Sequence, residues 1–177
     1  MKNIVILSSS PRKNGNSDLL CQEFQKGALS KGHNVEYVRI NDMNLGFCQG
    51  CYACNSTGKC FQQDGMNELC EKLVNADVIV FATPVYFYTM SAQLKTLIDR
   101  LVPVYTEIHS DIYMIITAWD EDINNLELTA ESIRGCTRDC FENCTEKDVL
   151  IVGGVYEKGE VKNNKAMEKA FLLGANC

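Results

Sequence analysis

Short apolar runs alternate with segments of helical periodicity along the whole chain. Continuously apolar runs predict strands buried on both faces, and apolar residues three or four apart predict helices with one buried stripe. The expected strands are residues 3–7, 34–40, 77–83, 111–118 and 149–155. The expected helices are residues 16–32, 66–75, 91–101, 122–143 and 163–174. This order predicts an α/β fold with a five-stranded parallel sheet covered by helices on both faces.

No linker, internal repeat or low-complexity segment interrupts this pattern, so residues 1–177 are expected to form one domain. Sheets of this kind bind ligands beyond the carboxyl ends of their strands. That rule selects the loops at residues 8–17, 84–90 and 118–122. A cysteine-rich loop at residues 45–64 follows the second strand and is expected to open at the same edge.

The loop after the first strand reads SSSPRKNGNS and combines hydroxyls, a glycine and two cations. Asn16 or Ser17 is expected to cap the following helix, whose positive N-terminal end favours an anion. The loop matches neither the G-x-G-x-x-G of dinucleotide folds nor the G-x-x-x-x-G-K-[ST] of nucleotide triphosphatases. It therefore predicts a site for a terminal monophosphate that is bound and not cleaved. The alternative is an ordinary polar loop before a capped helix.

The loop after the third strand begins at Pro84, which is expected to stop that strand and to preset the backbone of the turn. Tyr86, Phe87 and Tyr88 would provide flat apolar surface beside the phosphate loop. The alternative is a buried strand followed by a core helix, with the aromatic residues serving only as packing.

Four cysteines, Cys48, Cys51, Cys54 and Cys60, follow the order C-x2-C-x2-C-x5-C. Gaps of two residues are typical of runs that wrap an iron–sulfur cluster, whereas structural zinc sites more often use two separated pairs. A [4Fe–4S] cluster is the favoured interpretation. Zinc, or thiols retained for packing or oligomer contacts without any metal, are the alternatives.

Three further cysteines, Cys136, Cys140 and Cys144, recur every four residues within an expected helix. This spacing predicts that they lie along one helix face, where packing is the favoured role.

The segments SSSPRKNGNS, CQGCYACNSTGKC and TPVYFYTMSAQLKTLIDR resemble the NAD(P)H-dependent FMN reductases of the flavodoxin-like class. Within that class the chain most resembles the iron–sulfur flavoproteins, over essentially its whole length. The resemblance implies a doubly wound sheet of order 2-1-3-4-5. It also implies FMN contacts in three groups. These are a phosphate group of Ser10, Arg12, Asn16 and Ser17, a ring group of Pro84, Val85, Tyr86 and Phe87, and a closing group of Thr117, Ala118 and Trp119.

Two departures from the family pattern stand out. Ser9 occupies a position where many relatives carry glycine, and Asp64-Gly65 replaces a common pair of acids after the cysteine run. The resemblance implies [4Fe–4S] ligation by Cys48, Cys51, Cys54 and Cys60.

The expected function is that of an FMN-dependent oxidoreductase. Electrons would pass from NAD(P)H, or from a ferredoxin-like donor, through FMN to a small-molecule or protein acceptor, with the cluster carrying single electrons. No catalytic acid or base stands out. The alternative is a flavodoxin-like electron carrier or a redox-sensing module without a substrate of its own. A homodimer or homotetramer is implied by the relatives.

The composition of the chain limits the partners and the cellular location that can be expected. The net charge is −6 and no basic tract is present, so a nucleic-acid partner is not expected. The most apolar segment is too short to span a bilayer, and the N-terminus does not resemble a signal peptide. Ten cysteines without an export signal favour a reducing compartment, and the expected location is cytoplasmic.

Overall fold

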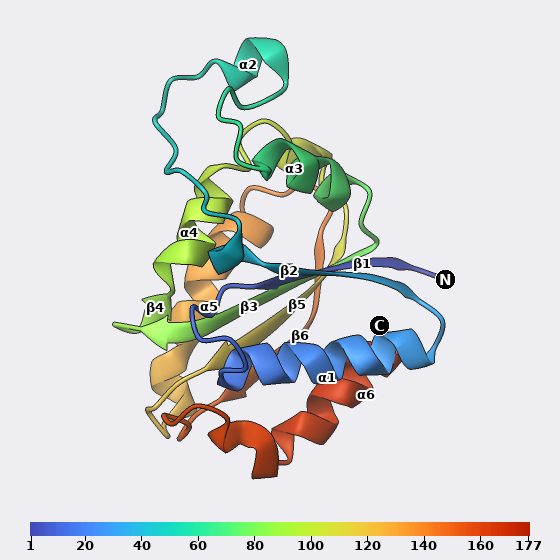
Figure 1. The fold of residues 1–177 in the computed structure, drawn as a ribbon, viewed down its shortest axis with the longest axis vertical. Coiled ribbons are helices and arrows are strands. Elements are labelled where there is room, and N and C mark those ends of the chain that lie inside the picture. The colour runs from blue at the N-terminus through green and yellow to red at the C-terminus, as the bar shows by residue number, and fades with distance from the viewer.

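The computed structural model describes residues 1–177. Five parallel strands form its sheet in the order β2-β1-β3-β5-β6, and a short strand, β4, pairs antiparallel with β3 (Figure 1). The strands are β1 (Asn3–Ser8), β2 (Asn34–Arg39), β3 (Val78–Tyr86), β4 (Thr89–Met90), β5 (Asp111–Thr117) and β6 (Thr145–Val152). The α-helices are α1 (Asn16–Ser30), α2 (Cys54–Thr57), α3 (Met66–Val74), α4 (Ala92–Asp99), α5 (Ile123–Thr137) and α6 (Ala166–Asn176). The five-stranded order confirms the doubly wound, flavodoxin-like prediction.

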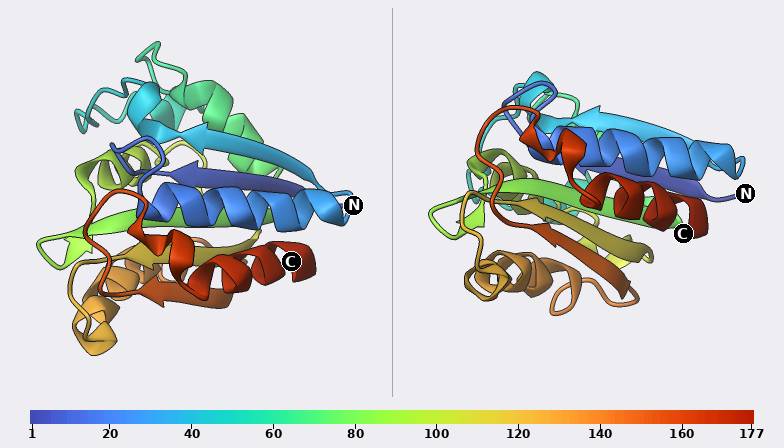
Figure 2. Two further views of the ribbon diagram at one scale, coloured as in Figure 1. Left: turned by 60° about the horizontal axis from the view of Figure 1, so that its bottom comes forward. Right: turned by 90° about the horizontal axis from the view of Figure 1, so that it is seen from below.

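Helices cover both faces of the sheet (Figure 2). Alternate residues of each central strand point to opposite faces, so the apolar core divides into two layers. Along β1, Val5 and Leu7 pack on the layer beneath α3, α4 and α5, whereas Ile4 and Ile6 pack beneath α1 and α6. All four side chains are buried, as expected for a parallel sheet covered on both sides.

Two glycines let α1 and α6 approach each other closely. A β-carbon at Gly27 would lie 2.0 Å from the carbonyl oxygen of Phe171, and one at Gly174 would lie 1.9 Å from that of Phe24. Since such contacts are impossible, the backbones can only meet where both side chains are absent. This packing holds α1, and therefore the loop that precedes it, firmly on the sheet.

The prediction that Pro84 stops the third strand is wrong. β3 continues to Tyr86, and Val85 pairs with Met90 in the β3–β4 hairpin that projects beyond the sheet in Figure 1. A proline favours extended backbone at its own position and at the residue before it. Pro84 can therefore lie within β3, where it pairs with Thr117 of β5. The Ser91 N–H, just after β4, donates to the hydroxyl of the neighbouring Thr83 at 2.9 Å.

The helix predicted over residues 122–143 ends at Thr137, and the fifth parallel strand begins at Thr145 and not at residue 149. The chain leaves the helix because Phe141 turns into the core, where it is 3% exposed. Cys136 is therefore helical, Cys140 lies in a turn, and Cys144 precedes β6. The predicted single helix face of cysteines is wrong.

None of the helices is both long and apolar enough to cross a membrane.

Candidate functional site

The phosphate loop, defined as residues 8–17, connects β1 to α1 and is held by buried hydroxyl groups. Ser9 Oγ donates to the carbonyl oxygen of Ala82 at 2.8 Å, and Ser91 Oγ lies 2.9 Å from Ser9 Oγ. Ser8 is buried and donates to Asp18 at 2.9 Å. These contacts tie the loop to β3 and to the start of α4, so its shape is fixed by neighbouring strands. Ser9, the departure from the family pattern, thus has a structural role.

Asp18 anchors the phosphate loop from below. Its carboxylate accepts hydrogen bonds from Tyr37 at 2.6 Å, Asn14 N–H at 2.7 Å and Arg39 at 2.6 Å. Burial raises the pKa of Asp18, but hydrogen bonds from Tyr37, Asn14 and Ser8 and the charge of Arg39 outweigh it, so the pKa is lowered. The buried Asp18 carboxylate is therefore charged, has hydrogen-bond donors around it, and connects α1 to β2.

A cleft of about 150 Å³ lies at the carboxyl ends of β1, β3, β5 and β6. Ten of the eleven predicted FMN contacts line this cleft. They are Ser10, Arg12, Asn16, Ser17, Pro84, Val85, Tyr86, Thr117, Ala118 and Trp119. Phe87 does not line the cleft, because it lies at the tip of the β3–β4 hairpin and is fully exposed. Residues from three separate loops are thus brought to one edge of the sheet.

The cleft is suited to an anion. Arg12 and Lys158 line it, and no carboxylate does. The N-cap of α1 is Gly15, which provides no capping side chain, and the backbone N–H groups of Asn16, Ser17 and Asp18 make no hydrogen bond within the chain. Unpaired amides at the positive end of a helix are a ready-made phosphate site.

The expected capping role of Asn16 or Ser17 is wrong. Both amide ends of Asn16 bond to the loop after β6, donating to Glu157 O at 3.0 Å and accepting from Gly159 N–H at 3.1 Å. Asn16 therefore positions that loop over the cleft. The Ser17 hydroxyl makes no hydrogen bond and remains available to a ligand.

Sequence reasoning missed the loop after β6. Val155, Tyr156 and Lys158 line the cleft, and Arg12 donates to Tyr156 O at 3.1 Å while its guanidinium lies 5.9 Å from the Tyr156 ring centre. The rule that ligands bind at the carboxyl ends of strands would have selected this loop had it been applied to the fifth parallel strand.

The tip of the β3–β4 hairpin is strained. Phe87 and Tyr88 have φ angles of 51° and 59°, in the left-handed region that bulky residues rarely occupy. Two-residue hairpins of this type prefer Asn-Gly or Gly-Gly. The Tyr88 hydroxyl donates to Asp120 at 3.3 Å, and this bond connects the hairpin to the loop after β5. In the same loop, Asp122 caps α5 by accepting from Asn124 N–H at 3.0 Å.

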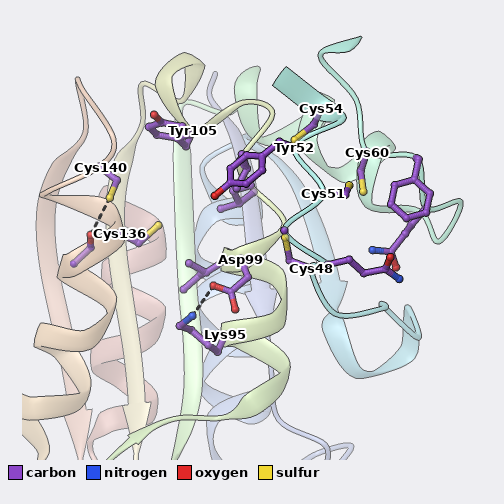
Figure 3. A pocket seen from close by; sticks show the side chains of 18 of the residues that line it. Cys48, Cys51, Tyr52, Cys54, Cys60, Lys95, Asp99, Tyr105, Cys136 and Cys140 are labelled. Carbon is purple, nitrogen blue, oxygen red and sulfur yellow. Dashed lines mark hydrogen bonds and ion pairs between the residues drawn. The ribbon is translucent and has the colours of Figure 1, made fainter. Parts of the chain in front are cut away.

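A larger cavity, of about 700 Å³, separates the cysteine loop (residues 45–64) from α4 and α5. Cys48, Cys51, Cys54 and Cys60 all line it, and Figure 3 places them on the loop side with Cys136 and Cys140 opposite. Between them, the Lys95–Asp99 ion pair lies along α4 (Figure 3). The cavity is mostly apolar, with Ile98, Leu101, Val102 and Tyr105 in its wall.

The four loop thiols suit an iron–sulfur cluster by their chemistry, because all are free and face one cavity. Their positions are those of an open loop, since no three His, Cys, Asp or Glu side chains are close enough together to hold a metal ion. Cys48 and Cys51 are exposed, and Gly50 and Gly58 have positive φ angles at turns of the loop. Ligation of a cluster therefore requires the loop to close.

Comparison with known proteins identifies relatives of this arrangement. The family model described as NADPH-dependent FMN reductase matches residues 2–119. An iron–sulfur flavoprotein of Archaeoglobus fulgidus is 39% identical over 103 residues, which cover 58% of this chain and 46% of that protein. One from Methanocaldococcus jannaschii is 39% identical over 101 residues, covering 57% of this chain and 52% of that protein. The chain thus spans about half the length of these curated relatives.

Solved structures share the fold at low sequence identity. An NAD(P)H:quinone oxidoreductase from Methanothermobacter marburgensis superposes with a TM-score of 0.77 at 20% identity, covering 99% of this chain and 96% of that one. An azoreductase from Bacillus anthracis gives a TM-score of 0.74 at 14% identity and covers 100% of both chains. Similarity at this level establishes the flavodoxin-like architecture.

Proposed function

The chain belongs to the NADPH-dependent FMN reductase family, and from this premise we propose that it is an oxidoreductase that binds FMN in the cleft at the carboxyl edge of its sheet. NAD(P)H or a ferredoxin-like protein would be the electron donor. A small molecule or a protein would be the acceptor. The four cysteines of residues 45–64 would hold a [4Fe–4S] cluster that carries single electrons.

The observation that carries this proposal is the composition of the cleft. Arg12 and Lys158 supply positive charge, the N-terminal amides of α1 are unpaired, and no carboxylate competes with an anion. Gly15 is needed for this shape, because a β-carbon there would lie 2.9 Å from the carbonyl oxygen of Arg12. A terminal phosphate ester fits such a site by charge and by hydrogen bonding.

The flavin ring would extend beyond this cleft. The cleft has a volume of about 150 Å³, below the roughly 300–1,000 Å³ typical of small-molecule sites, so the cleft would enclose only part of a nucleotide. Trp119 and Tyr86 lie at its rim with 72% and 41% of their surface exposed. These rings would provide the apolar surface beside the flavin. A second copy of the chain covering them would complete the site, which supports the proposed homodimer or homotetramer.

When bound, FMN supplies the redox chemistry, since it accepts a hydride and can release electrons one at a time. The protein's residues would bind and orient it. Arg12 and the Ser17 hydroxyl would hold the phosphate, Asp18 would keep the loop in shape, and the hairpin of Pro84–Met90 would flank the ring. No side chain in the cleft is an evident proton donor for catalysis.

Binding tests the phosphate site directly. We expect the protein, stripped of any flavin, to bind FMN at least tenfold more tightly than riboflavin, which lacks the phosphate; a tenfold difference corresponds to about 1.4 kcal/mol. Arg12→Gln should reduce FMN affinity about tenfold and leave riboflavin affinity unchanged. Lys13→Gln, which removes a neighbouring exposed charge outside the cleft, is the matched control. Equal binding of the two flavins would contradict the proposed site.

Turnover separates an enzyme from an electron carrier. FMN-loaded protein mixed with NADPH or NADH under argon should lose the visible absorbance of its flavin as the cofactor is reduced. Reduction by ferredoxin or dithionite, without reduction by either nicotinamide, would instead indicate a carrier. Iron and acid-labile sulfide should be present after anaerobic purification and be lost in Cys51→Ser but not in Cys177→Ser.

A further inference from the structure

Cys60 differs from the other three loop cysteines because its backbone is bonded to a helix outside the loop. Its N–H donates to Asn67 Oδ1 at 2.9 Å, and its carbonyl oxygen accepts from Asn67 Nδ2 at 2.9 Å. Asn67 belongs to α3, which packs on the core. Cys48 and Cys51, in contrast, are exposed and take part in no side-chain hydrogen bond. Cys60 is therefore the loop cysteine whose backbone is anchored to the packed part of the fold.

Arg100 lies beneath the two ends of the cysteine loop. Its guanidinium donates to Asp64 Oδ2 at 2.7 Å and Oδ1 at 3.0 Å, and to the carbonyl oxygen of Gly46 at 2.7 Å. Asp64 also accepts from Gly46 N–H at 3.0 Å. One buried arginine and one acid thus close the loop at its base, where residues 46 and 64 meet.

One N–H group of Arg100 has no hydrogen-bond acceptor. Arg100 is 2% exposed, and its Nε is buried without a partner in the chain. A buried guanidinium N–H without an acceptor is costly, so an acceptor is expected nearby when the site is complete. Hydrogen bonds from Arg100 to Asp64 raise the pKa of Arg100, so the guanidinium stays charged.

We propose that Arg100 is a positioning residue for the cysteine loop, holding its base closed and placing a buried positive charge with an unpaired N–H beneath the loop. This proposal rests on the proposed cluster. Since hydrogen bonds to ligand sulfurs and nearby charge set the reduction potential of such clusters, Arg100 would favour the reduced form, which carries one more electron.

The test is a redox titration of anaerobically purified protein, monitored by the electron paramagnetic resonance signal of the reduced cluster. Arg100→Gln should lower the midpoint potential by the equivalent of about a tenfold change in the oxidation equilibrium, which is about 59 mV for one electron. Lys59→Gln is the matched control, because it removes an equally charged neighbour of Cys60 that is exposed and paired with Glu71 at 2.9 Å. Solvent screens that charge, so its removal should leave the potential nearly unchanged.

Two further variants separate charge from loop closure. Arg100→Lys keeps the positive charge but loses the paired N–H donors of the guanidinium. Its midpoint potential should therefore lie between those of the wild type and Arg100→Gln. Asp64→Asn leaves the arginine charge uncompensated and should raise the potential. Opposite shifts for Arg100→Gln and Asp64→Asn are not expected from a loop that is merely loosened, because both variants weaken the same clamp.

The outcomes distinguish this proposal from the function it rests on. If the wild-type protein contains no iron and sulfide, the cluster and this role of Arg100 both fail, while the FMN site stands. If the cluster is present and Arg100→Gln behaves like Lys59→Gln, the cluster stands and the role of Arg100 is overturned. If Arg100→Gln holds no cluster, the midpoint potentials of Arg100→Lys and Asp64→Asn provide the test. Equal midpoint potentials for these two variants would overturn the proposed role of Arg100.

Discussion

The phosphate loop and the cysteine loop open at the same edge of the sheet but are built in opposite ways. The phosphate loop is buried from Ser8 to Ser10. It is bonded through hydroxyls to β3 and to the N-cap of α4, and Asp18, just after the loop, connects it to β2. The cysteine loop is largely exposed, and its firm contacts lie near its ends, at Gly46, Cys60 and Asp64. One site is formed in advance, whereas the other provides thiols that a ligand must gather.

The difference teaches where the energy of each site comes from. A preformed site is stabilised by folding, so its ligand gains affinity because little has to be ordered on binding. An open loop of thiols gains its order from the metal, whose binding energy then becomes folding energy. Mutations in the first loop should therefore act on the stability of the metal-free, flavin-free protein, and mutations of the exposed thiols in the second should not.

The largest effect is expected at Asp18. Asp18→Asn leaves the partly buried Arg39 guanidinium beside a neutral amide, inside a site where Asp18 itself is buried, and should lower the free energy of unfolding by about 3–5 kcal/mol. Asp42→Asn removes the other acid paired with Arg39, at 3.1 Å but exposed, and should cost less than about 1 kcal/mol. Denaturant unfolding of the cofactor-free proteins measures both. A loss at Asp18 no larger than that at Asp42 would contradict a preformed loop.

Acid should act on both loops through their carboxylates. Hydrogen bonds from Arg100 lower the pKa of Asp64, and the bonds and charge around Asp18 lower its pKa despite burial. Because each folded-state pKa lies below the ordinary value of 3.8, the unfolded chain binds more protons in acid. Stability from these groups is present above that value and is lost as the pH falls below it. Unfolding measured at successive pH values should show a shallower acid loss in Asp18→Asn and in Asp64→Asn than in the wild type.

The same substitution in the two regions should give different results. Cys21 is fully buried in α1, where burial raises the pKa of its thiol far above the ordinary value, and Cys21→Ser should cost about 1–3 kcal/mol by burying a hydroxyl. Cys51→Ser, on the exposed loop, should change the unfolding free energy of metal-free protein by less than about 0.5 kcal/mol. Similar losses at the two positions would mean that the cysteine loop is also ordered by folding.

A smaller gain in stability is expected at the tip of the β3–β4 hairpin. Phe87→Asn should raise the free energy of unfolding by about 1 kcal/mol, because asparagine tolerates the positive φ that phenylalanine does not. Phe87 is fully exposed, so no packing is lost, and Tyr88 keeps its bond to Asp120. Thermal unfolding measures the gain. An unchanged melting temperature would show that the turn relaxes without cost.

The sequence predicted the candidate site better than the details of its elements. Ten of the eleven proposed FMN contacts line one cleft, because the loops at residues 8–17, 84–90 and 118–122 share an edge of the sheet. Phe87 does not line it, because the strand continues past Pro84 and carries this residue to the hairpin tip. Tyr156 and Lys158 also line it, but they follow the fifth parallel strand, whose end lies outside the three predicted loops.

What the chain determined by itself is the alternation of strands and helices, and with it the sheet, its two apolar layers and the edge where ligands bind. These features follow from local periodicity, which any segment carries in its own residues. Only the tertiary structure decided where α5 ends, what Asn16 binds, and that Asp64 pairs with Arg100, 36 residues away. Such contacts join segments distant in sequence, and their energy depends on burial that no single segment can create.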